Sequence, residues 1–209
     1  ETSDTMVYYL GRDVKVYLNA EVNNHVYVNS SKQIHSTAAG GGTCFARQQS
    51  EGMVADAKVT DLTSVDLGIG ATDEDIAYIG QRTPLKAEIK KETTITLTRK
   101  KLDDVWDIIF NGDGDGVKGR WGIGGNVTAG STTNSHTGLE KPTVNYGYRI
   151  FVQLKGSTEV FTVRNATITS HSVTLNADGV TEETLEFVSH VDPKIATTAY
   201  TTVTGATEL

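Results

Sequence analysis

The chain has 209 residues, a formal net charge of −7, 37% hydrophobic residues and a single cysteine, Cys44. This composition excludes global disorder and an intrachain disulfide framework. No apolar run approaches the roughly 20 residues that a membrane helix needs, and the acidic balance argues against a protein that wraps duplex DNA through a basic face. The polar start without an initiator methionine predicts a trimmed or matured chain.

The first part of the chain alternates in polarity. Residues 1–12 are expected to form an N-terminal arm. Apolar side chains at every second position from Val14 to Val22 then predict a strand with one buried and one wet face. His25–Val28 predicts either a second strand or a continuation of the first strand past a bulge, and the small, Gly-rich stretch Ser36–Ser50 is interpreted as a loop.

The next stretch holds the strongest alternation in the chain. Met53–Leu62 and Ile76–Gly80 are predicted strands, and the residues between them are interpreted as an acidic connection. Lys86–Thr98 predicts a long strand because its polarity changes at every residue. Its even-numbered face is wholly polar and consists of Glu88, Lys90, Glu92, Thr94, Thr96 and Thr98.

One segment has helical periodicity. Leu102–Phe110 places four apolar side chains on one stripe, and these are the predicted core contacts of the helix: Leu102, Val105, Trp106 and Ile109. Acidic residues stand in the first turn, where the helix dipole favours them. Asn111-Gly112 predicts the end of the helix, since this pair tolerates left-handed geometry.

The remaining sequence predicts a loop, four strands and an arm. Residues 112–145 form a long loop rich in Gly, Ser, Thr and Asn, and residues 193–209 read as a C-terminal arm. The predicted strands between them are Gly147–Lys155, Glu159–Asn165, Thr167–Leu175 and Thr181–Val188. We therefore expect one domain, mainly β, built as an antiparallel β-sandwich or split barrel with one flanking α-helix.

Candidate chemistry is weak throughout. Asn111–Gly116 matches the first half of a calcium loop, but Gly122 stands where the loop needs a bidentate Glu, so a turn is the better interpretation. The five histidines show no metal-binding spacing, and no positive neighbour stands next to Cys44 to activate it. We therefore expect no catalytic residue, no metal site, no cofactor and no enzymatic activity.

The order of these pieces resembles the tail tube proteins of tailed phages and related injection systems. The resemblance rests on the order of six pieces: the N-terminal strand Asp13–Val22, the strand Met53–Leu62, the acidic connection Val65–Gln81, the alternating strand Lys86–Thr98, the single helix Leu102–Phe110 and the closing strand Thr181–Ser189. It implies a virion structural protein that assembles into hexameric rings. In such rings each subunit adds strands to a continuous inner β-barrel, and the rings stack into a tube.

The resemblance also implies partners and a location. It places the chain in a virion tail, assembled in the host cytoplasm, with other copies of itself and with sheath or other tail proteins as partners. Genomic DNA would pass through the lumen without specific binding, which the net charge of −7 favours. The candidate lumen face is the polar face from Glu88 to Thr98, and an ordinary outer sheet face explains it equally well.

Two other functions stay open from the sequence. A capsid decoration protein or other virion surface β-sandwich would form trimers or bind the capsid instead of forming tubes. A carbohydrate-binding module would need an exposed aromatic platform, for which Trp121, Tyr146 and Tyr148 are the candidates.

Overall fold

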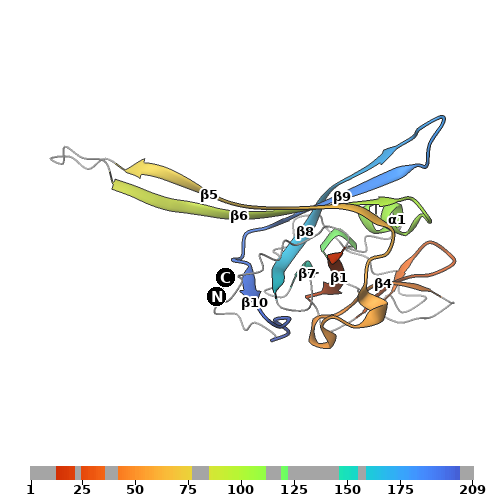
Figure 1. Ribbon diagram of the computed structural model, residues 1–209, viewed down its shortest axis with the longest axis horizontal. Helices are drawn as coiled ribbons and strands as arrows, with labels where there is room; N and C mark the ends of the chain where they lie inside the picture. Colours follow the sequence, from red (N-terminus) through yellow and green to blue (C-terminus); the bar gives the residue numbers. More distant parts are fainter. Residues whose placement is uncertain are drawn as a thin grey trace, which may run out of the picture.

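A computed structural model gives the architecture of the chain (Figure 1). It describes residues 13–21, 25–35, 42–76, 85–111, 119–121, 146–154 and 159–202, without the side chains of 73–76, 85–89 and 121. The strands are β1 (Lys15–Ala20), β2 (Val26–Val28), β3 (Ile34–His35), β4 (Thr43–Gln48), β5 (Leu62–Ile76), β6 (Leu85–Lys100), β7 (Tyr148–Gln153), β8 (Val160–Thr174), β9 (Glu182–Ser189) and β10 (Lys194–Ala196). The helix is α1 (Val105–Asn111), and short 3-10 turns are η2 (Gln49–Glu51), η3 (Ala55–Ala57) and η4 (Gly119–Trp121).

The strands follow one path in the order β3-β2-β4-β1-β7-β8-β9-β6-β5, with β10 on β8. Among the described strands, only β1 and β4 pair in parallel. The mainly β, largely antiparallel architecture with one helix is therefore confirmed. In the described part of the chain, no helix is long and apolar enough to cross a membrane.

Strand β8 divides the path into two layers. Its first half pairs with β7 and β10, and its second half pairs with β9. The first layer comprises β1 to β4, β7, β10 and the start of β8, and the second comprises the end of β8 with β9, β6 and β5. At the bend, Asn165 has a φ of 50°, which a sheet residue adopts only where the strand changes direction.

The core lies between the layers. Ile95 and Leu97 of β6 and Leu185 of β9 are fully buried in one cluster with Leu18 and Ile150 of the first layer. The ring of Tyr148 meets that of Phe187 edge-on, with centroids 6.1 Å apart. Burial of each such large side chain stabilises the fold by about 1.5–3 kcal/mol.

A buried ion pair fixes the bend of β8. Arg149 is fully buried, and its Nε and Nη2 donate to the two carboxylate oxygens of Glu21 at 2.9 and 2.8 Å. The backbone N–H of Asn165 donates to Glu21 Oε1 at 3.1 Å. Arg149 Nη1 also donates to the carbonyls of Tyr200 and Thr202, so the pair ties β1, β7, β8 and the segment after β10 together.

The helix begins later than its apolar pattern suggests. Asp103 Oδ1 accepts the backbone N–H of Val105 at 3.1 Å, which caps the helix and places its first turn after this residue. Val105, Trp106 and Ile109 are buried in the core. Leu102 precedes the cap and is 73% exposed, so the expectation that it shares this buried stripe is wrong.

Several predicted strand limits are also wrong. Met53–Leu62 consists mainly of turns and η3, and the strand starts only at Leu62. The supposed acidic connection after it is strand β5, and the supposed loop Ser36–Ser50 contains β4. Glu159–Asn165 and Thr167–Leu175 form the single strand β8 because the chain bends at Asn165 without leaving the sheet.

The start of the predicted C-terminal arm lies against its own subunit. Residues 194–196 pair with β8, and the N–H of Tyr200 donates to Thr162 Oγ1 at 3.3 Å. Arg149, Arg164 and Lys194 surround the Tyr200 ring at 5.3–5.9 Å from its centroid. Residues 1–12 and 203–209, and most of 112–145, lie outside the described residues.

Candidate assembly interface

The second layer has one polar face. Directly opposed residues in an antiparallel pair point to the same side of a sheet, so the register of β5, β6, β9 and β8 identifies this face. It carries Ser64, Asp66, Gly68, Gly70 and Thr72 of β5, Lys90, Glu92, Thr94, Thr96, Thr98 and Lys100 of β6, Glu182, Thr184, Glu186 and Val188 of β9, and Ser170 and Ser172 of β8. These side chains are exposed or half-buried.

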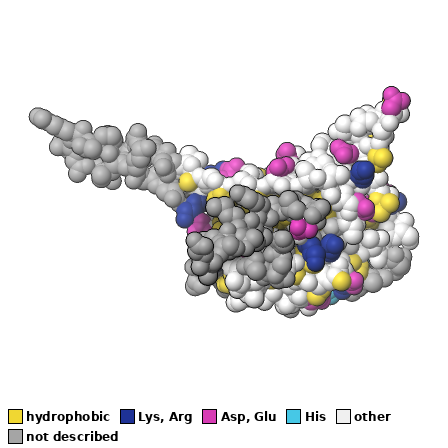
Figure 2. All heavy atoms as spheres, viewed as in Figure 1, with side chains coloured by type: hydrophobic (Ala, Val, Ile, Leu, Met, Phe, Trp, Pro, Cys, Tyr) yellow, Lys and Arg dark blue, Asp and Glu magenta, His cyan; other side chains and the backbone are white. Residues whose placement is uncertain are grey.

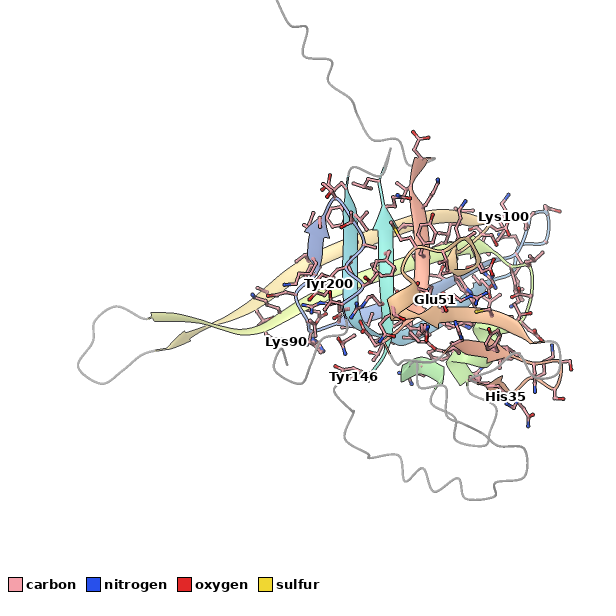
Figure 3. All side chains as sticks on the ribbon, turned by 90° about the horizontal axis from the view of Figure 1, so that it is seen from below. His35, Glu51, Lys90, Lys100, Tyr146 and Tyr200 are labelled. Carbon is pink, nitrogen blue, oxygen red and sulfur yellow. The ribbon has the colours of Figure 1, made fainter. Side chains whose placement is uncertain are left out.

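The polar face has a net negative charge, and most of its side chains are uncharged. Its four carboxylates, on Asp66, Glu92, Glu182 and Glu186, outnumber the ammonium groups of Lys90 and Lys100 by two, for a net charge of −2. The two lysines stand towards opposite ends of β6 (Figure 3). Figure 2 shows mostly uncharged atoms along the rim that this sheet forms, with acidic side chains at intervals.

Five of the six predicted lumen-facing residues lie together on this face, and the side chain of Glu88 is outside the described residues. Lys90 Nζ lies 2.7 Å from Glu92 Oε2. This hydrogen bond and the positive charge of Lys90 hold the pKa of Glu92 below its usual value. Thr98 and Thr184 share a hydrogen bond of 3.1 Å between their hydroxyls, which joins β6 to β9 across the face.

The opposite face of the same sheet is apolar. Ile95, Leu97, Leu185 and Phe187 are at most 1% exposed and point into the core. The sequence therefore alternates along β6 and β9 because one side of this layer meets the first layer and the other side does not.

The second layer ends in two strand edges. β5 is the last strand of the path, and no described strand pairs with its outer side. The end of β8 pairs with β9 on one side only. Arg120 Nε donates to the carbonyl of Ile168 at 3.0 Å on β8, and beyond that point no described strand covers this edge. Long unpaired edges favour association with another chain.

Figure 1 shows both edges on protruding hairpins. The pair β5–β6 extends far beyond the first layer on one side, and the β8–β9 hairpin projects on the other side. A ladder that runs from Leu62 to Ile76 against β6 holds the longer hairpin together. Because β5 and β8 are the outer strands of the series β8-β9-β6-β5, the two open edges of the described second layer lie on opposite sides of this sheet.

An ionic cluster connects the β8–β9 hairpin to β6 and α1. Glu183 is fully buried and accepts Arg99 Nε at 2.6 Å and Lys101 Nζ at 3.2 Å. Arg99 Nη2 also bonds Asp103 at 2.7 Å, and Lys101 Nζ bonds Asp107 at 2.5 Å. Burial lowers the pKa of Lys101, but its hydrogen bonds to the two carboxylates outweigh burial and raise the pKa overall.

The same cluster contains a possible set of metal ligands. Oxygen and nitrogen atoms of Asp107, His171 and Glu183 lie within 4.8 Å of one another. Lys101 already bonds both carboxylates, and a cation placed between them would be repelled by this ammonium group and by Arg99. The arrangement therefore fits an ion-pair clamp between α1 and the hairpin better than a metal site.

The remaining sequence candidates lie away from these edges. Cys44 is half-buried, and burial raises the pKa of its thiol against the opposing charge of Arg47. Such a thiol is a poor nucleophile at neutral pH. Asn111 ends α1, and the rest of the calcium-like stretch, residues 112–116, lies outside the described residues.

The sequence of β5 contains a pattern that predicts a strand at this surface, namely apolar residues at every second position. Val65, Leu67 and Ile69 recur at every second position and pair with the buried side of β6. The intervening glycines resemble turn signals. However, a Cβ on Gly68 would stand 2.8 Å from Thr94 Oγ1, so this glycine serves a close cross-strand approach.

No family model matches the chain, and no curated protein matches it. Among solved structures, it is similar to a chain in the virion of a native gene transfer agent particle, at 12% identity and a TM-score of 0.43, over 90% of this chain and 99% of that one. It is also similar to a chain of the PVC sheath-tube complex of an extracellular contractile injection system in its extended state. That likeness has 12% identity and a TM-score of 0.45, over 93% of this chain and 97% of that one.

A third similar structure is Hcp1 from Salmonella typhimurium, at 8% identity and a TM-score of 0.34, over 88% of this chain and 92% of that one. Likenesses this distant leave the function to be inferred from the chain's own geometry.

Proposed function

We propose that the chain is a virion structural protein, the tube subunit of a phage-type tail, and that six copies form each of a stack of rings whose lumen conducts the genome during ejection. The observation that carries this proposal is the four-stranded second layer, which within the described residues has one uncovered polar face and two open edges. The proposal assigns the single domain no catalytic role and no cofactor.

Strand direction supports a closed ring. Each neighbouring pair in the series β5, β6, β9, β8 is antiparallel, so β5 and β8 run in opposite directions. In a ring made by rotation about one axis, β8 of each copy meets β5 of the next. That contact is again antiparallel, and the alternation continues around the ring without a break. A closed barrel of this kind removes both exposed edges.

The polar face suits the wall of a conduit. A lumen that carries DNA must avoid tight phosphate contacts, because each cationic contact would retard passage. The described face has a net charge of −2, and its other polar side chains are mainly short hydroxyls. Such a wall repels the phosphate backbone weakly and offers few groups that bind it. In this arrangement the first layer lies on the outside of the tube, where sheath or other tail proteins would bind.

The location follows from the proposed role. We place the protein in the virion tail, after assembly in the host cytoplasm. The segments 1–12, 112–145 and 193–209 are proposed as the arms and loop that complete the domain.

Negative-stain microscopy of the purified protein tests the proposal. We expect rings or tubes about one hexamer wide at high protein concentration, with light scattering that reports the same ring mass. A monodisperse monomer at high concentration would contradict the proposal. A two-fold dimer joined through β5, or a trimer, would contradict it equally, and the trimer would favour a capsid decoration protein.

A further inference from the structure

We infer that the apolar tip of the β8–β9 hairpin of one copy fills an apolar cleft beside β5 of the next copy. This inference rests on the proposed function, because the ring brings the two regions together. The tip is defined here by Val173, Leu175 and Val180, and the cleft by Val14, Leu62, Val65, Leu67, Leu154 and Phe161.

The tip is unusually exposed for its composition. Leu175 is 80% exposed, Val180 56% and Val173 37%. Half of the six large hydrophobic residues that are exposed in the described chain lie on this one hairpin. A single exposed leucine is ordinary, but a cluster on a protruding hairpin indicates a contact surface.

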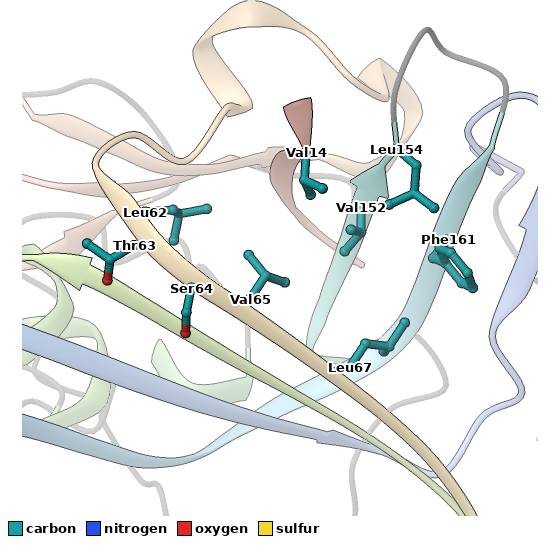
Figure 4. A pocket seen from close by; sticks show the side chains of 9 residues that line it. All are labelled: Val14, Leu62, Thr63, Ser64, Val65, Leu67, Val152, Leu154 and Phe161. Atoms are coloured by element: carbon teal, nitrogen blue, oxygen red, sulfur yellow. The ribbon is translucent and has the colours of Figure 1, made fainter. Parts of the chain in front are cut away.

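The cleft is an unfinished part of the core. It measures about 520 Å³ and opens between β5 and the strands β7 and β8, as Figure 4 shows. Its six defining side chains are only partly buried, and each packs against the main hydrophobic cluster. The described chain provides the walls of this cleft and leaves it open, so additional apolar groups would complete the packing.

The strand faces identify the second copy as the occupant. Val173 is opposite Glu183, which is buried on the inner side of the sheet, so Val173 points to that side as well. On β5, Val65 and Leu67 are opposite the buried Leu97 and Ile95 and also point inward. When the β8 edge of one copy pairs with the β5 edge of the next, inner faces adjoin inner faces. The tip therefore meets the cleft on the side away from the lumen.

The contact gives the ring a direction. The β8 tip and the β5 cleft belong to the two outer strands of the second layer, so their contact joins two different surfaces and the interface is heterologous. A two-fold pairing of β5 with β5 would leave every tip exposed and every cleft open. Burial of the tip in the cleft of the next copy therefore favours the ring over a two-fold dimer joined through β5.

Leu175→Asp tests this inference. The substituted side chain is solvent-exposed in the subunit, so the monomer is expected to keep its Tm and circular dichroism spectrum. The critical concentration for ring formation should rise about tenfold or more, because in the ring a carboxylate replaces a leucine that the interface buries. Leu175→Met is the matched control, since it keeps an apolar side chain of similar volume at the tip and should assemble as the parent does.

Cross-linking gives an independent measurement. In a Cys44→Ser background, Leu175→Cys subunits mixed with Leu67→Cys subunits should form inter-chain cross-links in assembled rings. Lys194→Cys mixed with Leu67→Cys should not, because Lys194 is exposed on the other side of β10 from the cleft. Rings that persist unchanged in Leu175→Asp, or assembled rings in which Leu175→Cys forms no cross-link with Leu67→Cys, would overturn this inference alone. Absence of rings in the parent chain would overturn the proposed function and this inference together.

Discussion

The two layers of the molecule are stabilised in different ways. In the first layer, a buried charge is compensated within the subunit: Arg149 is fully buried and bonds Glu21, Tyr200 and Thr202. Among the residues that the structure describes, the second layer has a solvent-facing polar side, two open edges, an unfilled cleft beside β5 and an exposed Leu175. The difference agrees with the proposed ring, in which the first layer secures the fold of the subunit and neighbouring copies complete the second layer.

The largest expected effect concerns the first layer. Glu21→Ala removes one partner of a buried ion pair and leaves Arg149 uncompensated, so the free energy of unfolding should fall by about 3–5 kcal/mol. Urea denaturation of the dilute monomer measures this loss. Lys91→Ala, which breaks the exposed pair with Asp192, is the control and should change stability by less than about 1 kcal/mol. A similarly small change for Glu21→Ala would contradict the account of the first layer.

A smaller effect is expected where the ionic cluster supports the second layer. Glu183→Gln should cost about 2–3 kcal/mol, since charged hydrogen bonds are lost while Arg99 keeps Asp103 and Lys101 keeps Asp107. Hydrogen exchange should accelerate first in β9 and the end of β8. If exchange rises equally in β1 and β7, the cluster does not act locally on the hairpin.

Substitutions on the polar face should have little effect on stability, but added positive charge there should change how assembled rings interact with DNA. Thr94→Lys with Thr96→Lys should alter the free energy of unfolding by no more than about 1 kcal/mol, because both sites are on the wet side of β6. Assembled rings of this variant should retain DNA at low salt, and retention should fall as salt rises. The matched control Thr94→Ser with Thr96→Ser should not retain DNA. Equal retention by both variants would place the face away from the lumen.

The smallest expected effect depends on pH. Lys32 pairs with Asp104 just before α1, and the hydrogen bond from Lys32 holds the pKa of Asp104 below its ordinary value of 3.8. A carboxylate with a lowered folded-state pKa adds stability above its ordinary pKa and loses it as pH falls through the folded pKa. Both side chains are about half exposed, so Lys32→Ala should cost at most about 1 kcal/mol at pH 7.

Thermal unfolding of the Lys32→Ala variant and the parent, compared from pH 7 to pH 2, measures this dependence. The difference between them should disappear at the acid end. A difference that grows on acidification would contradict the pairing.

The sequence predicted the second layer's central strand better than its edges. Alternation in β6 is clear because Ile95 and Leu97 face the core while Thr94 and Thr96 face away from it. In β5 the same alternation is interrupted by glycines, and Gly68 is explained only by its close approach to Thr94. The sequence did not predict that β8 is one continuous strand. The bend within it is at Asn165, whose left-handed backbone is fixed by Glu21 from a distant part of the chain.

The candidate interface was predictable only in part. The polar positions of β6 are visible in the sequence because they recur with a period of two along one strand. The cleft was not predictable, since Val14, Leu67 and Phe161 come from three separated parts of the chain and meet only when the layers close. The open edges could not be predicted either, because an edge is defined by the order of strands in space.

A cryo-EM map of the assembled protein tests the central claim most directly. The account predicts a continuous antiparallel wall in which β8 of each copy pairs with β5 of the next, with the polar face of β6 towards the lumen. A ring in which the β5 edge stays unpaired, or in which the polar face of β6 lies on the outside, would contradict it.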